Sequence, residues 1–249
     1  EADFRFVLRA AVNTARAVAA AHAAGCVIGD VNHSGFLIGA DATVTLIDAD
    51  SFQFGEGARQ FLCRVGVPEY TAPELAGLTL AETPRTPDHD AFALAIVLFQ
   101  LLFLGRRPFA GLSRRDDFGI AEAIRAHAFA YGRHRRGDLA PPPGALRLDE
   151  VPEAVGELFE RAFAPEAAGR RPSAADWVAA LEGFERALAS CPDNPRHHHA
   201  SPDGTCPWCR VERLGRTALF PAPGTPGAAP LALPGEELRE RLAAIRLPE

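Results

Sequence analysis

The apolar run from Ala91 to Leu104 constrains the fold more than any other feature of the sequence. It is 14 residues long and is interrupted once, by a glutamine. A segment that is apolar on all sides must be buried, either in a protein core or in a membrane. A membrane-spanning helix needs about 18–20 apolar residues, so this run is too short to cross a bilayer. We therefore predict a buried helix over residues 89–104, ended by Gly105 and Pro108, with the other elements packed around it.

Helical periodicity also appears before and after this run. Residues 4–23 carry apolar side chains at helical spacing and end near Gly25, a favourable C-cap. Short apolar runs flank a polar loop at residues 29–35 and, together with residues 43–47, predict a β-hairpin. The chain has 249 residues, 47% of them apolar, which is enough for one sizeable core and an appendage. We expect a mainly α fold with a short β-hairpin at the polar loop, an irregular stretch over 51–70, and further helices over 117–130, 151–163 and 174–189.

The charge of the chain excludes some classes of function. The net charge is −6, so no bulk attraction to nucleic acid or to a membrane surface is expected. The chain has no lysine, and a mechanism that needs a lysine cannot run within these residues alone. Methionine is also absent and the first residues are acidic, which indicates a fragment or a processed product without a targeting sequence. Five cysteines, three of them in one motif, favour a reducing, cytoplasmic location over a disulfide framework.

Several polar residues form an ordered series of landmarks. Asp30 lies in the polar loop, within a Gly-Asp-Val-Asn sequence, and Asp48 follows 18 residues later at the end of the predicted hairpin. A carboxylate at a strand end projects into a cleft, and Mg²⁺ prefers such hard oxygen ligands; a solvated turn residue is the alternative for Asp48. The remaining landmarks are Asp90 at the start of the buried helix, Glu74 at the end of an Ala-Pro-Glu sequence, and Arg171 before Pro-Ser-Ala.

This series resembles the C-terminal lobe of a protein kinase, from the catalytic loop onward. The resemblance implies that Asp30 accepts or orients the substrate hydroxyl, with Asn32 beside it, and that Asp48 holds the Mg²⁺ that bridges the phosphates of ATP. It also implies structural roles. Asp90 would brace the catalytic loop, and Arg171 would pair with Glu74. The N-terminal lobe is missing from the sequence, so we expect the fragment alone to bind ATP poorly.

The catalytic loop departs from the kinase pattern at several positions. Gly35 stands where the second metal-binding asparagine is usual, and Asn32 stands where a lysine is usual. The loop arginine before Asp30 is absent, because the preceding pair is Ile28-Gly29. Without that arginine, phosphorylation of the activation segment is not expected to be the switch. Two functions therefore stay open: an atypical Ser/Thr protein kinase, or a pseudokinase that acts as a regulatory scaffold without transfer.

A second motif combines three cysteines with a histidine. Cys191, His197, Cys206 and Cys209 follow a C-x5-H-x8-C-x2-C spacing, and such a ligand set suits tetrahedral zinc in a closed, structural site. Three histidines are contiguous, so His198 or His199 are alternatives to His197. A redox Cys-x-x-Cys pair and incidental cysteines are the other interpretations, although no βαβ pattern surrounds the motif.

The two motifs together are similar to a bacterial family of kinase-like domains that end in a C…H…CPWC zinc element. Some members of that family also carry a helix-hairpin-helix DNA-binding region, which residues 214–249 do not show. The resemblance implies a protein substrate or a regulatory partner, whereas nucleic-acid contact has weak support from a mildly basic rim and no membrane partner is expected. We expect a kinase-like C-lobe over residues 1–189, the zinc motif over 190–213, and a Pro/Gly/Ala linker with a short helix over 214–249.

Overall fold

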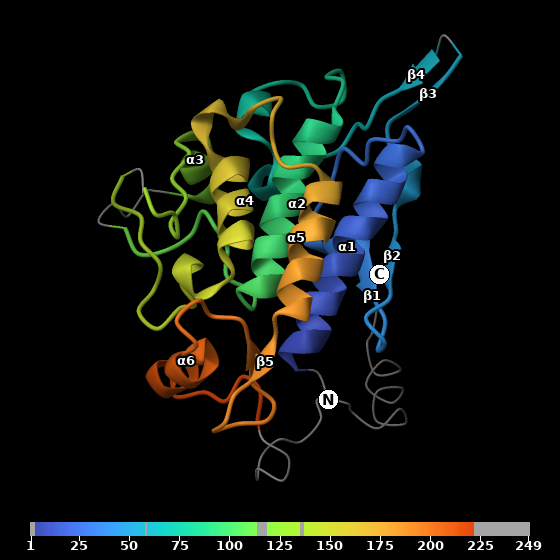
Figure 1. Ribbon diagram of the computed structural model, residues 1–249. Coiled ribbons are helices and arrows are strands. Elements are labelled where there is room, and N and C mark those ends of the chain that lie inside the picture. Colours follow the sequence, from blue (N-terminus) through green and yellow to red (C-terminus); the bar gives the residue numbers. More distant parts are fainter. Residues whose placement is uncertain (1–2, 58, 114–118, 135–136, 222–249) are drawn as a thin grey trace, which may run out of the picture.

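In the computed structural model, helix α2 is the centre of the fold (Figure 1). The structure describes residues 3–57, 59–113, 119–134 and 137–221. Helix α2 (Pro87–Leu102) begins after the N-cap Thr86 and carries a proline in its first turn. All of its residues from Asp90 to Phe99 are buried, so the predicted buried helix is confirmed, two residues earlier at each end.

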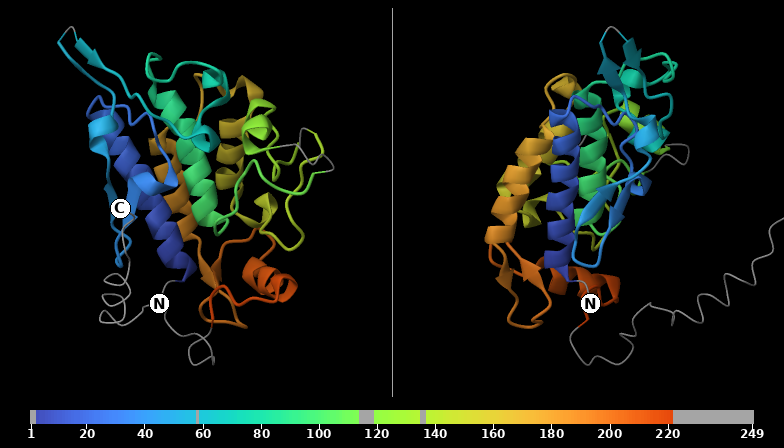
Figure 2. Two further views of the ribbon diagram at one scale, coloured as in Figure 1. Left: turned by 180° about the vertical axis from the view of Figure 1, so that it is seen from behind. Right: turned by 90° about the vertical axis from the view of Figure 1, so that its right-hand side faces the viewer.

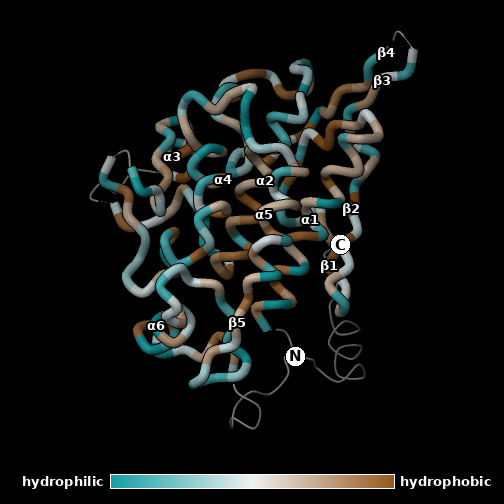
Figure 3. Tube along the Cα trace, viewed as in Figure 1, coloured by the Kyte–Doolittle hydropathy of each residue, from teal (hydrophilic) through white to brown (hydrophobic). Residues whose placement is uncertain are grey.

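Three long helices surround α2. Helices α1 (Phe4–Ala23) and α4 (Glu153–Phe163) both pack against α2, and α5 (Ala174–Arg186) packs against α1 and α4. Each begins and ends close to the predicted bounds, and Figure 3 shows hydrophobic and hydrophilic residues alternating along these helices, as in amphipathic helices. Together they give the mainly helical fold that the sequence predicts.

Helix α3 is shorter than the sequence predicts. It covers Ile120–Arg125 instead of 117–130, and residues 114–118 lie outside the described part of the chain. The chain turns at His127, whose φ angle of 50° ends the helical path. The amide of Ala130 then bonds to the carbonyl of Pro108, 2.9 Å away, so the following residues return to the end of α2.

The β-structure consists of small hairpins. Strands β1 (Phe36–Ile38) and β2 (Val44–Leu46) form the predicted antiparallel hairpin after the polar loop. A second hairpin, β3 (Phe54–Glu56) and β4 (Arg59–Phe61), lies in the stretch expected to be irregular and projects away from the body (Figure 2). The rings of Phe54 and Phe61 stack 4.9 Å apart across it. Short 3-10 helices fill the connections: η1 (His33–Gly35), η2 (Ala49–Ser51), η3 (Pro68–Tyr70), η4 (Pro73–Leu75), η5 (Leu148–Glu150) and η6 (Pro165–Ala167).

The C-terminal Cys/His motif packs closely against the helical body. It contains β5 (Ala189–Ser190), β6 (His198–His199) and α6 (Pro207–Gly215). Trp208 of α6 is 2% exposed, and its ring lies 4.6 Å from Phe4 and 5.3 Å from Phe220. Both Trp208 and Phe220 belong to the same hydrophobic core as α2. Residues 219–220 of the expected linker are therefore packed, and the expected short helix that follows the linker lies outside the described residues.

Within the described part of the chain, every helix is too short or too polar to serve as a membrane span.

Candidate functional site

The polar loop is fixed to the buried helix through Asp90. This carboxylate is 1% exposed and accepts hydrogen bonds from the backbone amides of Ile28 (2.7 Å) and Gly29 (2.8 Å). Nε2 of His22, near the end of α1, lies 2.9 Å from the same carboxylate. A buried carboxylate with three partners holds its neighbours firmly, because each lost contact would leave a desolvated charge. The loop that carries Asp30 is thus attached to the two most central helices.

Asp30 and Asp48 line one small cavity. The cavity lies between the polar loop and η2, and both carboxyl residues are part of its wall. One carboxylate oxygen of Asp30 accepts a hydrogen bond from the amide of Val67, 3.2 Å away. Asp48 is exposed and has a left-handed φ of 57°, and its carboxylate has no hydrogen-bond partner within the described residues. An unpartnered carboxylate beside a second one is a suitable donor set for a hard divalent cation such as Mg²⁺.

Asn32 is engaged inside the loop. It is 6% exposed and caps η1, where its side-chain oxygen accepts bonds from the amide (2.9 Å) and the hydroxyl (2.5 Å) of Ser34. Its amide nitrogen donates to the carbonyl of Asp30 at 3.0 Å. This side chain shapes the loop next to Asp30. A Cβ at Gly35, by contrast, would meet no atom within 4 Å, so the loop has room for a side chain there.

The segment after the second hairpin is tied to the same loop by Tyr70. Its hydroxyl lies 2.8 Å from Nδ1 of His33 and donates to the side-chain oxygen of Gln100 at 2.9 Å. Burial raises the pKa of Tyr70, so the hydroxyl keeps its proton and its role as a donor at neutral pH. Thr71 donates to the carbonyl of Val67 at 2.9 Å. Both residues thus serve to hold the segment in place.

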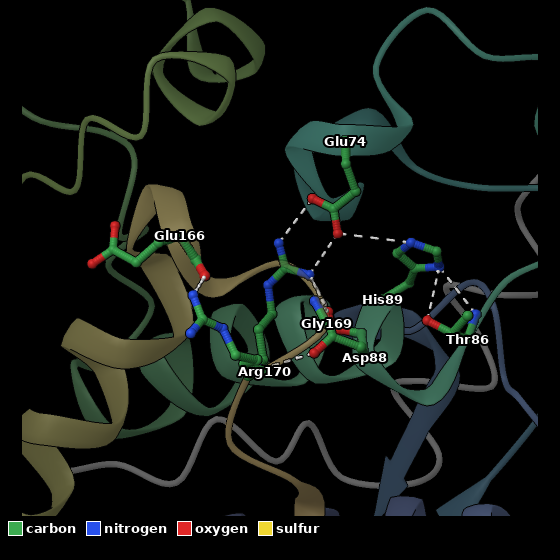
Figure 4. Close-up of polar contacts among 8 residues, drawn as sticks. Glu74, Thr86, Asp88, His89, Glu166, Gly169 and Arg170 are labelled. Atoms are coloured by element: carbon green, nitrogen blue, oxygen red, sulfur yellow. Dashed lines mark hydrogen bonds and ion pairs between the residues drawn. The ribbon is translucent and has the colours of Figure 1, made fainter.

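Arg171 forms the expected pair with Glu74 and adds a second partner, Asp88. Its guanidinium bonds both carboxylate oxygens of Glu74, at 2.6 and 2.8 Å, and one oxygen of Asp88 at 2.6 Å. Figure 4 shows Glu74 facing Asp88 and His89 at the start of α2. Burial raises the pKa of Glu74, but the hydrogen bonds and charge of Arg171 outweigh burial and lower the pKa overall. The cluster joins η4, α2 and the segment before α5.

The predicted zinc ligands come together at the base of the helical body. The ligand atoms of Cys191, His197, Cys206 and Cys209 all lie within 4.8 Å of one another. Nδ1 of His197 is 3.4 Å from the sulfur of Cys209 and 3.6 Å from that of Cys206. A zinc tetrahedron with three sulfurs and one nitrogen has edges of about 3.6–3.8 Å. These four residues could therefore hold zinc, whereas the alternatives His198 and His199 lie outside the cluster.

The other ring nitrogen of His197 faces a carboxylate. Nε2 lies 3.1 Å from Oε1 of Glu212. Asn194 Nδ2, which donates to the carbonyl of Phe220 at 3.1 Å, also lies 3.0 Å from the same ring nitrogen. A carboxylate behind a ligating histidine fixes the tautomer that presents Nδ1 to a metal.

The thiols of the cluster influence one another. Burial, with the neighbouring sulfurs, raises the pKa of Cys206 to about 12. Burial also raises the pKa of Cys209. Burial acts in the same direction on Cys191, but backbone amides of Asp193 and Asn194 outweigh it and lower the pKa of Cys191. Thiolates that are gathered this closely repel one another, and a bound cation would neutralise that repulsion. Metal binding would therefore displace the thiol protons.

Three residues of this framework were not predicted as functional from the sequence. His22 is expected only as a helix cap or a core residue, and neither Arg85 nor Glu212 belongs to any motif. Each acts through a contact with another part of the chain: His22 with Asp90, Arg85 with the carbonyl of Gly29, and Glu212 with His197. The one available signal for His22 is its position just before Gly25 at the end of a helix that leads into the polar loop.

Comparison with known proteins supports the kinase-like interpretation. No protein-family model matches the chain. The chain is 40% identical to "Protein kinase YegI" of Escherichia coli O157:H7 over 216 residues, which are 84% of this chain and 33% of that protein. The similarity to the protein of the same name from Escherichia coli strain K12 is 39% over the same length. The chain thus spans about a third of the length of these relatives, and the similarity supports a bacterial protein-kinase-like family.

Proposed function

We propose that this chain supplies the catalytic loop and the substrate-docking lobe for phosphoryl transfer from ATP to a serine or threonine hydroxyl of a protein. The observation that carries the proposal is the shared cavity of Asp30 and Asp48, next to a loop held by Asp90. Phosphoryl transfer depends on positioning and charge neutralisation, and this arrangement offers both.

In this proposal the two carboxylates have different tasks. Asp30 is held by the amide of Val67 in the segment that would bind substrate, so it orients the attacking hydroxyl and accepts its proton. Asp48 is exposed and unpartnered among the described residues, so it would hold Mg²⁺, which when bound neutralises the charge of the nucleotide phosphates. Asn32 and Asp90 position the loop. Glu74 and Arg171 hold the docking segment against α2.

The decisive experiment is a phosphotransfer assay on the natural full-length chain. Asp30→Asn removes the proton acceptor while keeping the size of the side chain, and Asp48→Asn removes the metal ligand. Asp50→Asn is the matched control, because Asp50 is also exposed and lies two residues away, outside the cavity. We expect both test variants to lose transfer and the control to keep it. Equal transfer by wild type and Asp30→Asn would show that the activity comes from elsewhere.

A pseudokinase scaffold is the second candidate, and Gly35 favours it. At this position the loop lacks the asparagine side chain that would bind a second metal ion. Asn32 cannot replace it, because its side chain is bonded to Ser34 and to the carbonyl of Asp30. Because the space around Gly35 is open, Gly35→Asn should be accommodated. If the wild type is a weak enzyme, this variant should raise transfer and tighten Mg²⁺ binding. If neither wild type nor Gly35→Asn is stabilised by Mg²⁺–ATP in a thermal melt, the scaffold is favoured.

We also propose that Cys191, His197, Cys206 and Cys209 bind a structural zinc ion. The donor set and the close approach of the four ligand atoms support a closed site. Metal analysis of protein purified without added zinc tests this, with Cys206→Ser as the depleted variant and Cys26→Ser as a control cysteine outside the cluster. An equal zinc content in all three would argue against the site.

A further inference from the structure

Arg85 is a buried arginine that joins three separate segments. It is 4% exposed, although arginine is normally exposed unless it is paired. Its guanidinium donates to the carbonyls of Gly29 (2.9 Å), Val65 (3.2 Å) and Leu80 (3.2 Å). These carbonyls belong to the catalytic loop, to the segment that leads to the docking region, and to the stretch that precedes α2. One side chain thus fixes the relative positions of all three.

The backbone of Arg85 is fixed as well. The side chain of Gln53, which is 4% exposed, donates to the carbonyl of Arg85 and accepts from its amide, both at 2.7 Å. The side chain of Arg85 lies with Asp30 and Asp90 around a small cavity on the inner side of the loop. A buried positive charge that is hydrogen-bonded to three carbonyls is costly to displace. The geometry therefore gives Arg85 a single, well-defined position.

The conformation of Gly29 explains why the guanidinium next to the catalytic loop belongs to Arg85 and not to a residue of the loop. Gly29 has a φ of +77°, and a Cβ there would lie 2.5 Å from Cβ and 2.8 Å from the sulfur of Cys63. Such distances exclude a side chain unless Cys63 moves. The position before Asp30 therefore cannot carry the arginine that the kinase resemblance would place there. The guanidinium of Arg85 reaches the carbonyl of Gly29 from the side of α2.

The docking segment is also held without an added phosphate. Between residues 48 and 74 the sequence has three hydroxyl side chains, and each is hydrogen-bonded. Ser51 donates to the carbonyl of Asp48 at 2.9 Å. Tyr70 and Thr71 make the contacts described above, and Tyr70 is 4% exposed. Within the described residues, the contacts of this segment therefore form with unmodified hydroxyl groups and need no phosphate.

We propose that Arg85 is the positioning residue that keeps the catalytic loop and the docking segment in register, so that the site is assembled without phosphorylation of residues 48–74. This inference rests on the proposed phosphotransfer function. The ordering of the two segments by the guanidinium of Arg85 can, however, be measured independently of phosphotransfer activity.

The first test measures order directly, by amide hydrogen exchange on the folded chain. Arg85→Met keeps the length of the side chain but removes all donors, and Arg85→Lys keeps the charge on a group that cannot span three carbonyls. We expect exchange of the amides in residues 27–32 and 64–68 to rise at least about tenfold in Arg85→Met. Arg186→Met, an exposed arginine on α5 with 72% side-chain exposure, is the matched control. Unchanged exchange in folded Arg85→Met would overturn the proposal.

The second test measures transfer by the natural full-length chain. Misplacing a loop by about 1 Å can cost about a hundredfold in rate, so kcat should fall by about that factor in Arg85→Met while KM for ATP changes little. Arg85→Lys should recover part of kcat, and phosphatase treatment of wild type should change kcat less than about twofold. A phosphatase-sensitive kcat, or wild-type kcat in Arg85→Met, would refute the positioning role. Absence of transfer in wild type would instead refute the proposed function and leave the exchange test decisive for Arg85.

Discussion

The packing of Trp208 predicts that the Cys/His motif and the helical body unfold as one unit. Trp208 lies in α6, next to Cys209 of the Cys/His cluster, and its ring contacts Phe4 of α1 and Phe220. Its indole nitrogen donates to the carbonyl of His198 at 2.7 Å. Arg210, two residues further along α6, adds two bonds to the carboxylate of Glu150, at 2.6 and 2.5 Å. Loss of this interface should therefore lower the free energy of unfolding of the whole helical body.

The expected magnitude follows from the burial of the ring. Trp208 is 2% exposed, and replacing a buried tryptophan by alanine typically costs about 3–5 kcal/mol. Trp208→Phe keeps most of the apolar contacts but leaves the carbonyl of His198 without its donor, which costs about 1–3 kcal/mol. Because a domain of this size is stable by about 5–15 kcal/mol, the alanine variant should lose a large fraction of its stability.

The assay is urea unfolding followed by far-UV circular dichroism, which reports on α1, α2, α4 and α5 and not mainly on α6. Unfolding is measured with zinc present and after chelation, for wild type and for Trp208→Ala. Two changes at one interface should be non-additive, so chelation should destabilise the variant less than it destabilises wild type. The reasoning is refuted if Trp208→Ala lowers the free energy of unfolding of the helices by less than about 0.5 kcal/mol, the usual effect of a surface substitution.

Three further predictions concern the framework around the site. Asp90→Asn should lower the free energy of unfolding by about 1.5–3 kcal/mol, because an amide group cannot accept from both backbone amides and from His22; an unchanged melting temperature would contradict this. The lowered pKa of Glu74 means that its contribution to stability is present above its ordinary value of 4.5 and is lost as the pH falls through the lower folded value. The acid limb of the stability curve should therefore flatten in Glu74→Gln, and identical limbs would count against the pairing with Arg171. Cys206→Ser should lower the melting temperature more than Cys26→Ser does, since only Cys206 belongs to the cluster. Equal shifts would show that the cluster does not contribute to stability.

The sequence predicts the elements whose signal is local. The buried helix α2 is identified by its long apolar run, which only Gln100 interrupts, and α1, α4 and α5 by their helical spacing. The four residues of the Cys/His cluster are likewise identified by spacing, because a Cys-x2-Cys pair needs only one turn to converge. In these cases the sequence period places the apolar side chains on one face of a helix, and the short spacing brings the ligand side chains together, so local sequence is enough to predict the structure.

The sequence does not predict contacts between distant segments. Arg85 lies 56 residues from Gly29, and His22 lies 68 residues from Asp90; no local period relates such positions. The β3–β4 hairpin was missed because its strands are only three residues long and project from the body, so no core imposes an alternating pattern on them. The close packing of α6 was missed for a related reason, since it depends on Phe4 at the other end of the chain.

The chemistry of the framework bears on the choice between an enzyme and a scaffold. The loops are held by three buried charged side chains: Arg85, Asp90 and Arg171. Buried ion pairs add little stability compared with apolar residues of similar volume, so stability alone is a weak reason to have them. What charged, multiply bonded groups provide is a fixed geometry, and a site for phosphoryl transfer requires such placement to within about 0.5 Å. A scaffold that needed only a binding surface would work equally well with apolar packing beneath its loops. Asp90 and Arg85 fix the segment that carries Asp30, and Arg171 fixes the segment that carries Glu74; this placement is what the proposed phosphoryl transfer requires.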